Sequence, residues 1–548
     1  MQTFTSNVIN YKKIKVGVIR FFINNKKFII PFLCVLFFIS LYFLIDFSTQ
    51  SLVAHDEGLY ARRARLLEQS DNWLYPPFPS PHHKTLGSYW FIALSIRLFG
   101  NSEFALRLPS ILSSFLCLIS SYLIALKITN KKSALISLFS LSSMPIWIQY
   151  SRYASPDFPF LLCILLAILF FLKSLDTPIY LIQYFYIFLS GLFVSISFFI
   201  RSYMAFVPLF GLAPFIFYHL YRKKLSFRSF FFAGIFIGSI PTLFNLYFSF
   251  KKFGIIGITK LLDFAKKQAL GEIDFNNLFL LPLNFLYLTF PIGILVLILF
   301  VFTKSNIKIN YPLLIYLYPL ISLLLLLCMS TSYPHYYLFL LPHLSIIFST
   351  YISSNSIRYT FSSSAIRYLF SITILFISTI IFYSIINFKH LIIQYSYGNP
   401  FILYILTFLV LSYFVSIRFL FRNKYLKSNL INSFYIIVIP QYICLSLLYN
   451  FGVLGNPNYN TKIFLNDDTV LPIINSNTIY LFNVDSKIQT LFSYYLPASK
   501  VVDDFEVIKK YKYVITTNSE SFDKLDRKKS FIPVKKFKNH LLLKNISK

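Results

Sequence analysis

The chain has 548 residues, of which 56% are hydrophobic and only 13% are charged, and its formal net charge is +31. Soluble proteins carry about 25% charged residues, so a soluble globular protein is excluded. The mean hydropathy is +0.64, and apolar runs long enough to cross about 30 Å of hydrocarbon recur along the chain. The composition therefore predicts an α-helical polytopic membrane protein.

The positive charge bears on the binding partners to expect, and the cysteine positions bear on disulfides and zinc sites. Basic loops that anchor a membrane protein and attract membrane lipids explain the charge most simply. Nucleic acid is not expected as a partner, because the basic residues are scattered among short loops, whereas an anionic substrate remains open. The five cysteines lie in apolar segments, so neither a disulfide framework nor a zinc knuckle is indicated.

In chain order, residues 1–27 form a basic tail ahead of the first apolar run, 28–45. A signal peptide has a shorter core of about 7–15 residues, so we interpret this run as an uncleaved helix. From the apolar runs we predict about 13 transmembrane helices. They are 28–45, 107–126, 133–150, 157–172, 179–200, 203–220, 229–250, 278–302, 311–329, 333–349, 368–387, 401–417 and 433–451.

The charges of the loops orient these helices. If the N-terminus is cytoplasmic, the connections after even-numbered helices hold most of the loop Lys and Arg residues. The short connections on the other side hold only Arg152, Arg201 and Lys389. The positive-inside rule requires this bias. An odd number of helices places the C-terminus outside, together with residues 46–106 and 251–277, and function is expected in these long outer segments.

The first outer segment, 46–106, contains two predicted surface helices. In "DEGLYARRARLLEQSDNW", Tyr60, Ala64 and Leu67 share one helical face, which we expect to lie on the membrane. The second helix is "GSYWFIALSIRLF", residues 87–99. The four prolines of the intervening "YPPFPSPHHKTL" exclude a helix and favour an extended path.

Two charged residues of this segment have both a structural and a functional interpretation. Asp56 follows the first helix, where it serves either as a helix cap or as a carboxylate that accepts a proton from a nucleophile or orients it. Lys84 lies in the proline-rich connection, where it either snorkels to the interface or holds a phosphate as a point charge. The residues alone leave both interpretations open.

The last segment, 452–548, predicts a small α/β domain on the outer side. "TIYLFNV" (478–484) and "KYVITT" (512–517) are typical of strands. "SKIQTLFSYYL" (486–496) and "SESFDKLDRK" (519–528) are typical of helices, each opened by a serine cap. No glycine-rich phosphate loop is present, and a structural or lid role is the simplest expectation.

The 56–114 sequence, from "DEGLYARRARLLEQ" through "NWL" to "LFGNSEFALRLPS", resembles the first outer loop of bacterial aminoarabinose lipid A transferases. It is also similar to the wider dolichyl-phosphate-mannose protein mannosyltransferase family of glycosyltransferase superfamily C. The acidic pair, the Tyr60-Ala61 pair and the "LFG…E…RLPS" element carry this resemblance. Thirteen spans followed by an outward α/β tail extend it to the whole chain.

The resemblance implies site residues position by position. Asp56 matches the catalytic acid, and its acidic neighbour Glu57 is the second catalytic candidate. Lys84 matches the lysine that binds the donor phosphate. Tyr336 or Tyr337 matches a tyrosine that faces this phosphate. The expected basic residue of 251–277 is Lys260, Lys266 or Lys267. Further candidates are Tyr60, Arg152, Asp157 and His335.

The chain also departs from the family pattern. His83 replaces a glutamate that helps to hold a metal ion, Thr85 replaces a proline, and Leu59 replaces an arginine. Histidine is itself a zinc ligand, so a divalent metal ion at His83 remains open. No other cofactor is expected.

The implied function is transfer of a sugar from a polyprenyl-phosphate donor to an acceptor on the periplasmic side of the bacterial inner membrane. Lipid A or a related envelope glycolipid is the first expectation for the acceptor. The alternatives are a protein O-mannosyltransferase-like enzyme, a transporter or flippase of lipid-linked glycans, and a non-catalytic assembly protein. Transporters often contain internal repeats, and none is evident in this sequence.

Overall fold

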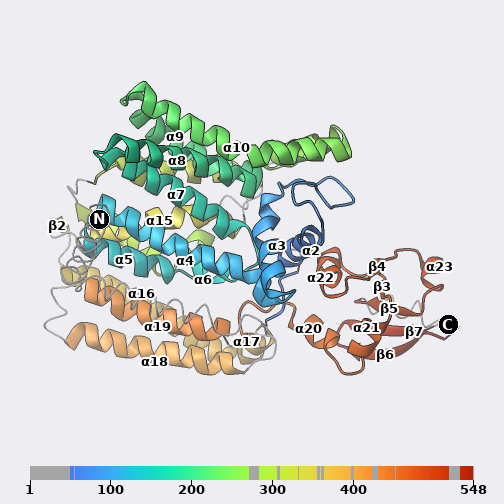
Figure 1. Cartoon of the computed structure of the whole chain (residues 1–548). Coiled ribbons are helices and arrows are strands. Elements are labelled where there is room, and N and C mark those ends of the chain that lie inside the picture. The colour runs from blue at the N-terminus through green and yellow to red at the C-terminus, as the bar shows by residue number, and fades with distance from the viewer. Residues whose placement is uncertain are drawn as a thin grey trace, which may run out of the picture.

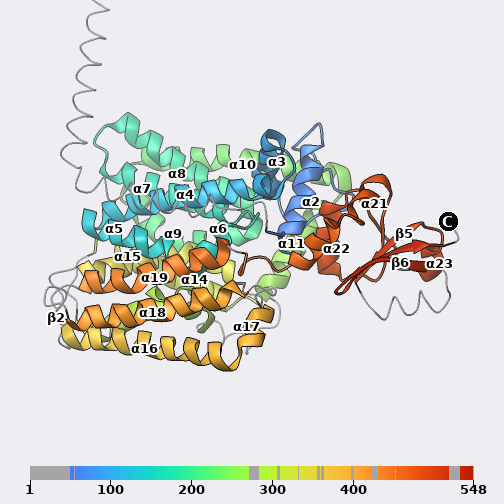
Figure 2. The ribbon, with the colours of Figure 1, turned by 90° about the horizontal axis from the view of Figure 1, so that it is seen from below.

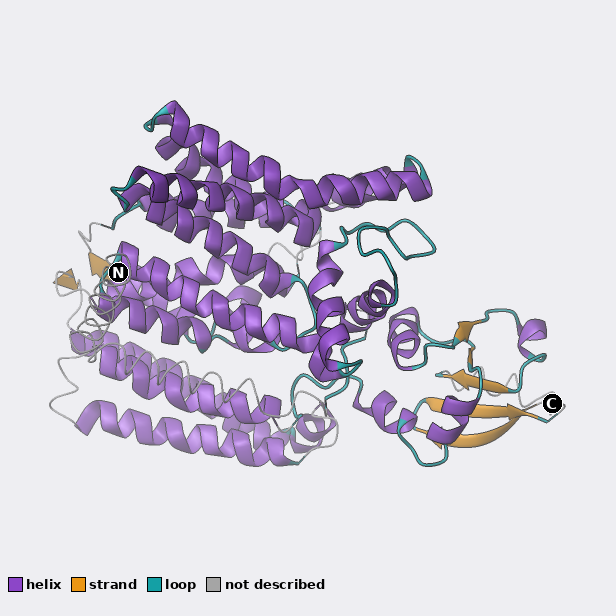
Figure 3. Cartoon of the chain, in the orientation of Figure 1, coloured by secondary structure: helices purple, strands orange, loops and turns teal. Residues whose placement is uncertain are grey.

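The computed structural model consists of a bundle of helices with a small α/β domain at one end (Figures 1 and 2). Helices α2 and α3 lie between the bundle and this domain in both views. Figure 3 shows that most of the strands belong to the domain. The structure describes residues 50–54, 56–270, 283–304, 309–330, 333–353, 358–359, 363–395, 400–422, 430–450, 452–517 and 531–546.

The bundle is built from helices of very different lengths. They are α4 (Glu103–Ile128), α5 (Lys131–Ser142), α6 (Pro145–Ser151), α7 (Asp157–Asp176), α8 (Tyr180–Arg201), η1 (Ser202–Ala205), α9 (Phe206–Tyr221), α10 (Leu225–Phe253), α11 (Ile256–Leu270), α13 (Ile292–Phe302), η2 (Leu313–Leu317), α14 (Tyr318–Leu327), η3 (Pro334–Leu340), α15 (Leu341–Ser353), α16 (Ser363–Asn387), α17 (Lys389–Tyr395), α18 (Phe401–Arg422) and α19 (Leu430–Asn450). A two-residue ribbon pairs β1 (Thr303–Lys304) with β2 (Arg358–Tyr359).

Within the described residues, six helical segments are long and apolar enough to cross a membrane. They are Glu103–Ile128, Asp157–Asp176, Tyr180–Tyr221, Leu225–Phe253, Pro334–Ser353 and Phe401–Arg418. Three shorter apolar helices are Leu313–Leu327, Ile374–Asn387 and Phe434–Asn450. The protein is therefore a multi-pass membrane protein. The span expected at 28–45 lies outside the described residues.

One expected span is interrupted. Residues 133–150 were expected to form a single helix, but α5 ends at Ser142 and α6 begins at Pro145. The physical reason is proline: the residue before it is driven out of the helical region, and Met144 has an extended ψ of 131°. Pro145 then occupies the first helical position, where its missing N–H is not needed.

The two helices predicted in 46–106 are present as α2 (Asp56–Glu68) and α3 (Gly87–Phe99). The expectation that the apolar face of α2 lies on the membrane is wrong, however. Tyr60, Ala64 and Leu67 are buried in one cluster with residues of α3 and of the C-terminal domain. Helical periodicity identifies an apolar face, and here the protein itself supplies the surface that covers it.

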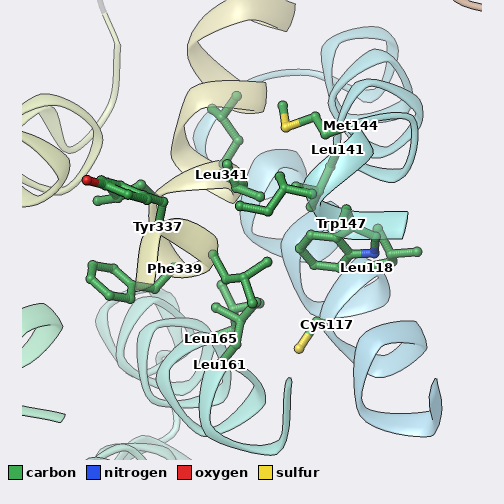
Figure 4. Close-up of a cluster of buried hydrophobic side chains, with 14 of the residues drawn as sticks. Cys117, Leu118, Leu141, Met144, Trp147, Leu161, Leu165, Tyr337, Phe339 and Leu341 are labelled. Atoms are coloured by element: carbon green, nitrogen blue, oxygen red, sulfur yellow. The ribbon is translucent and has the colours of Figure 1, made fainter. Parts of the chain in front are cut away.

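The largest hydrophobic core joins α4, α6 and α7 to η3 and α15 (Figure 4). Trp147 packs edge-on against Phe158, with ring centroids 4.9 Å apart. Cys117 of α4 and Leu161 and Leu165 of α7 surround this pair in the same cluster. This packing fixes the relative positions of the helix ends that carry the polar residues described below.

The C-terminal domain contains a mixed five-stranded sheet in the order β4-β3-β5-β7-β6. Strand β3 is parallel to β4 and β5, and β7 is antiparallel to β5 and β6. The elements are α20 (Tyr459–Leu465), α21 (Leu471–Ser476), β3 (Tyr480–Leu481), α22 (Ser486–Tyr495), β4 (Lys500–Val501), α23 (Phe505–Ile508), β5 (Tyr513–Thr516), β6 (Phe531–Phe537) and β7 (His540–Asn545).

The predicted α/β class of this segment is confirmed, but details of the prediction change. Strands β3 and β5 lie where strands were expected. Helix α22 also lies where a helix was expected, but its cap is Asp485, whose side chain accepts from the Lys487 N–H, and not Ser486. Asp485 precedes the first helical residue, as a cap must. The helix expected at 519–528 falls outside the described residues.

Helices α8 and α10 pack through glycines. A Cβ atom on Gly191 would lie 2.1 Å from the Phe231 carbonyl oxygen, and one on Gly234 would lie 2.1 Å from that of Phe188. Gly238, one turn after Gly234, also approaches the backbone of α8. Small residues spaced in this way let membrane helices approach closely.

Replacement of Gly234 by leucine is therefore expected to force α8 and α10 apart and to destabilise the bundle by about 1–3 kcal/mol or more. The melting temperature of the purified protein in detergent measures this loss. The control is Phe236→Leu on the same helix, because Phe236 is 68% exposed and makes no such contact. Equal melting temperatures for the two variants would contradict the prediction.

Candidate active site

A buried ion pair fixes the start of α2. Glu57 is fully buried, and its Oε2 and Oε1 atoms accept hydrogen bonds from Arg107 Nη2 (2.8 Å) and Nε (2.9 Å). The same carboxylate accepts from the N–H groups of Val53 (2.8 Å) and Ala154 (2.7 Å). Glu57 thus joins α2 to α4 and to the turn before α7. Asp56, one residue earlier, remains exposed.

A chain of polar contacts runs from the proline-rich connection to the bundle. Lys84 Nζ donates to the Tyr60 hydroxyl at 2.6 Å, and Arg201 Nη1 donates to the same hydroxyl at 3.0 Å. Arg201 Nη2 lies 2.7 Å from Asp157 Oδ1. Four segments therefore converge: the connection, α2, the end of α8 and the beginning of α7. Two cations share one tyrosine hydroxyl, and one carboxylate partly offsets their charge.

Aromatic residues of η3 close one side of this cluster. Gln268 Nε2 of α11 donates to the Tyr336 hydroxyl at 3.0 Å, and the Arg201 guanidinium lies 5.9 Å from the Tyr336 ring centroid. His335 stacks on Tyr333, with ring centroids 5.7 Å apart. A small cavity here is lined by Asp157, Arg201, His335 and Tyr336 together with Phe160, Leu161, Met204, Leu338 and Phe339.

Loss of water around the cluster perturbs its ionisable groups. The pKa of Lys84 is lowered to about 8, chiefly by desolvation. The Arg201 cation acts in the same direction, and Tyr89, Asp157 and Asp56 oppose the shift. Burial also raises the pKa of the Tyr60 hydroxyl, with Arg201 opposing. The Asp56 carboxylate is close enough to act on both groups. The cluster therefore favours the approach of an anion, which would relieve the repulsion between its two cations.

Several candidates from the sequence lie elsewhere. Lys260, Lys266 and Lys267 are exposed on α11, and the residue of this helix that reaches the cluster is the buried Gln268. Tyr337 is 1% exposed and belongs to the largest hydrophobic core (Figure 4). Its neighbour Tyr336 belongs to the same core and also faces Arg201.

Arg152 connects the end of α6 to α19. Its Nη2 donates to Asn450 Oδ1 at 3.1 Å, and its guanidinium lies 5.8 Å from the Tyr449 ring centroid. Asp157, the neighbouring candidate in the sequence, forms an ion pair with Arg201.

The histidines before Lys84 take part in aromatic packing. The ring centroids of His82 and His83 are 4.2 Å apart, and His82 Nε2 is hydrogen-bonded to the Tyr89 hydroxyl. Burial and the neighbouring Arg63 cation hold the pKa of His82 well below its usual range. In the described part of the chain, no three His, Cys, Asp or Glu side chains gather as metal ligands.

Sequence reasoning missed Arg201 and Gln268 as site residues. Arg201 is the one Lys, Arg, Asp or Glu residue in the apolar stretch 179–221, and such a residue within a membrane segment is a functional candidate by default. That signal was available. Gln268 had no comparable signal, because a single polar residue in an amphipathic helix is ordinary.

The fold and the cluster together define a class: a polytopic membrane protein with a cationic site at one end of its helix bundle, beside a small α/β domain. Comparisons with known proteins make this more particular. Residues 83–248 match the family model of dolichyl-phosphate-mannose-protein mannosyltransferase. The crystal structure of ArnT from Cupriavidus metallidurans bound to undecaprenyl phosphate has the same fold, with a TM-score of 0.72 and 14% identity over 95% of this chain and 97% of that one.

The chain is also similar to curated undecaprenyl phosphate-alpha-4-amino-4-deoxy-L-arabinose arabinosyl transferases. It is 29% identical over 153 residues to one from Pseudomonas fluorescens, which is 27% of each chain, and 27% identical over 195 residues to one from Shewanella sediminis, which is 35% of each. The matches span only about a third or less of these relatives. The resemblance to aminoarabinose lipid A transferases is confirmed.

The Glu57–Arg107 pair generates a prediction about stability. Arg107→Ala would leave a fully buried carboxylate without its counter-charge, which costs about 3–5 kcal/mol. We expect a large fall in the melting temperature of the purified protein. Arg97→Ala, at an exposed arginine of α3, serves as the control and should change stability by no more than about 0.5 kcal/mol. A loss as small as that of Arg97→Ala would show that the pair is not needed.

Proposed function

We propose that this chain is a membrane glycosyltransferase that transfers a sugar from a polyprenyl-phosphate donor to an envelope acceptor, with lipid A or a related glycolipid as the first candidate. The observation that carries the proposal is the convergence of Lys84, Tyr60, Arg201 and Asp157 beside the exposed Asp56. The names of the curated relatives and the undecaprenyl phosphate bound by ArnT support the donor class.

The two cations serve the leaving group in this proposal. As the bond between sugar and phosphate breaks, negative charge grows on the phosphate, and fixed cations near it lower the barrier. Lys84 and Arg201 are held for this task by the Tyr60 hydroxyl between them. Asp157 keeps the Arg201 guanidinium in place through their ion pair. Tyr336 borders the same cavity and is assigned to the phosphate side.

The two acids of α2 have different roles. Asp56 is exposed and is assigned to accept a proton from the acceptor hydroxyl or phosphate, or to orient it. Glu57 is assigned a positioning role, because Arg107 and two backbone N–H groups use both of its oxygens. The sequence-based expectation of a catalytic Glu57 is therefore not retained in the proposal.

The topology is part of the proposal. We retain about 13 transmembrane helices with a cytoplasmic N-terminus in the bacterial inner membrane, and place the site and the C-terminal domain in the periplasm. The positive charge of the connections assigned to the cytoplasm supports this orientation. We also retain the division into a basic tail (1–27), a transmembrane glycosyltransferase domain (28–451) and a C-terminal domain (452–548).

The direct test supplies the purified protein with a radiolabelled polyprenyl-phosphate sugar and lipid A in detergent. A glycosyltransferase produces labelled lipid A and free polyprenyl phosphate. A flippase reconstituted in vesicles would instead move the intact donor across the bilayer without cleaving it. Mass spectrometry of lipid A from a deletion strain identifies the acceptor, since an unchanged profile would direct the search to protein or another glycan.

The role of Asp56 generates a prediction. Asp56→Asn keeps the size of the side chain but removes its ability to accept a proton, so transfer should fall by about 10²–10⁴-fold. The measurement is the initial rate of sugar transfer at equal amounts of folded protein. Asp71→Asn makes the same chemical change at an exposed position of the same loop and should leave the rate unchanged. A near wild-type rate for Asp56→Asn would remove Asp56 from the reaction.

The pKa of Lys84 generates a second prediction. Because its pKa is about 8, Lys84 is mostly a cation at pH 7 and mostly neutral at pH 9. Affinity for polyprenyl phosphate should therefore fall as pH rises through 8, by about tenfold between pH 7 and pH 9. Binding titrations at each pH measure the Kd. Lys84→Arg keeps its charge throughout this range, so its Kd should stay nearly constant. Parallel slopes for the two proteins would exclude Lys84 as the titrating ligand.

A further inference from the structure

The C-terminal domain lies directly against the helix that begins with Asp56. A Cβ atom on Gly58 would lie 3.2 Å from backbone atoms of Thr490 and Leu491 in α22, so α2 and α22 approach as closely as their backbones allow. Leu491 and Tyr494 are buried in the same hydrophobic cluster as the apolar face of α2. Figures 1 and 2 both show the two helices side by side.

Arg65 of α2 forms hydrogen bonds with the C-terminal end of α22. Its Nη1 and Nη2 atoms donate to the carbonyl oxygens of Tyr494 (2.6 Å) and Ser493 (3.0 Å) in the last turn of α22. Carbonyl groups at a helix end have no partner within the helix and carry the negative end of its dipole. A buried arginine of α2 therefore caps a helix of the C-terminal domain.

The segment that precedes Asp56 is also held from the C-terminal side. Asn456 Oδ1 accepts from the N–H (2.8 Å) and the hydroxyl (2.5 Å) of Ser51. Asn458 Nδ2 donates to the Leu52 carbonyl at 2.9 Å, and the Leu52 N–H donates to the Tyr495 hydroxyl at 3.3 Å. Residues 50–54 are thus hydrogen-bonded to the C-terminal domain on one side and to Arg107 and Glu57 on the other.

A third anchor explains the glutamate of the "LFG…E…RLPS" element. Glu103 Oε1, in the first turn of α4, accepts from the Tyr495 hydroxyl at 3.0 Å and lies 2.7 Å from Lys462 Nζ. Both partners belong to the C-terminal segment. Glu103 therefore connects the bundle to the same face of the domain that holds residues 50–54.

From these contacts we propose that the C-terminal domain is a positioning element of the active site, which holds α2 and residues 50–54 so that Asp56 faces the acceptor correctly. The inference rests on the proposed function. Tyr60 of the same helix accepts hydrogen bonds from Lys84 and Arg201, so the domain acts on the site through α2. Arg201 is also held by its ion pair with Asp157 of α7, and this contact does not depend on α2. A displacement of about 1 Å at a catalytic group can reduce the rate by about 10²-fold.

Two variants weaken the contacts of the C-terminal domain with α2 and residues 50–54 and leave the proposed reacting groups unchanged. Asn456→Ala removes the acceptor of Ser51, and Gly58→Ala places a methyl group against the α22 backbone. Alanine raises the helix propensity of α2 by about 1 kcal/mol, so a loss of activity in Gly58→Ala is not explained by an unfolded helix. Lys535→Ala is the control, because its ion pair with Asp467 lies within the C-terminal domain.

In both variants we expect kcat for transfer to fall by about 10–100-fold. Kd for polyprenyl phosphate should change less than kcat, because the Asp157 ion pair still holds Arg201. Hydrogen exchange in residues 50–68 should accelerate in Asn456→Ala, and Lys535→Ala should match the wild type in every assay. An unchanged kcat with unchanged exchange would overturn the inference. If the wild type transfers no sugar, the proposed function fails. In that case, unchanged hydrogen exchange of residues 50–68 in Asn456→Ala would still overturn the positioning role of the C-terminal domain.

Discussion

The buried pair of Glu57 and Arg107 is the interaction on which the arrangement of the site depends. Their side chains are 0% and 2% exposed, and two charges removed from water are tolerated only when hydrogen bonds satisfy them. Here the carboxylate accepts four hydrogen bonds, and the guanidinium also donates to the carbonyls of Gln50 and Ser51. One pair thus joins the segment before α2, α2 itself, α4 and the turn before α7. The segment before α2 leads to Asp56, α2 carries Tyr60, and the turn before α7 leads to Asp157.

The cluster itself is an unbalanced arrangement of charge. Lys84 and Arg201 converge on Tyr60, and Asp157 forms an ion pair with Arg201. The lowered pKa of Lys84 reports the free energy that burial of this cation requires. A polyprenyl phosphate would supply the missing negative charge, so the same groups that destabilise the empty site favour the bound one. Stability given up in this way is a common property of functional sites.

The local sequence predicted the secondary-structure elements around the site better than it predicted which elements pack against each other. The "GSYWFIALSIRLF" run predicted α3 with the bounds that the structure has, because the apolar segment is flanked by glycines at Gly87 and Gly100. Asp56 and Lys84 were found through the spacing of a family motif. Arg201 and Gln268 were not, since their roles arise only when α8 and α11 pack beside η3. Periodicity revealed the apolar face of α2 but could not show that α22 covers it.

The place of the site follows from the two partners that the proposed reaction must bring together. A polyprenyl chain stays in the bilayer, so its phosphate reaches a bundle only at the end of its helices, where Arg201 ends α8 and Lys84 lies in the adjoining loop. An acceptor head group approaches from the water beyond. The proposed function places Asp56 between these two directions, on a helix that contacts the bundle through Glu57 and the C-terminal domain through Arg65 and Gly58. A helix supported from only one side would move with that side, whereas support from both sides would keep Asp56 aligned with the phosphate and the acceptor in the proposed reaction.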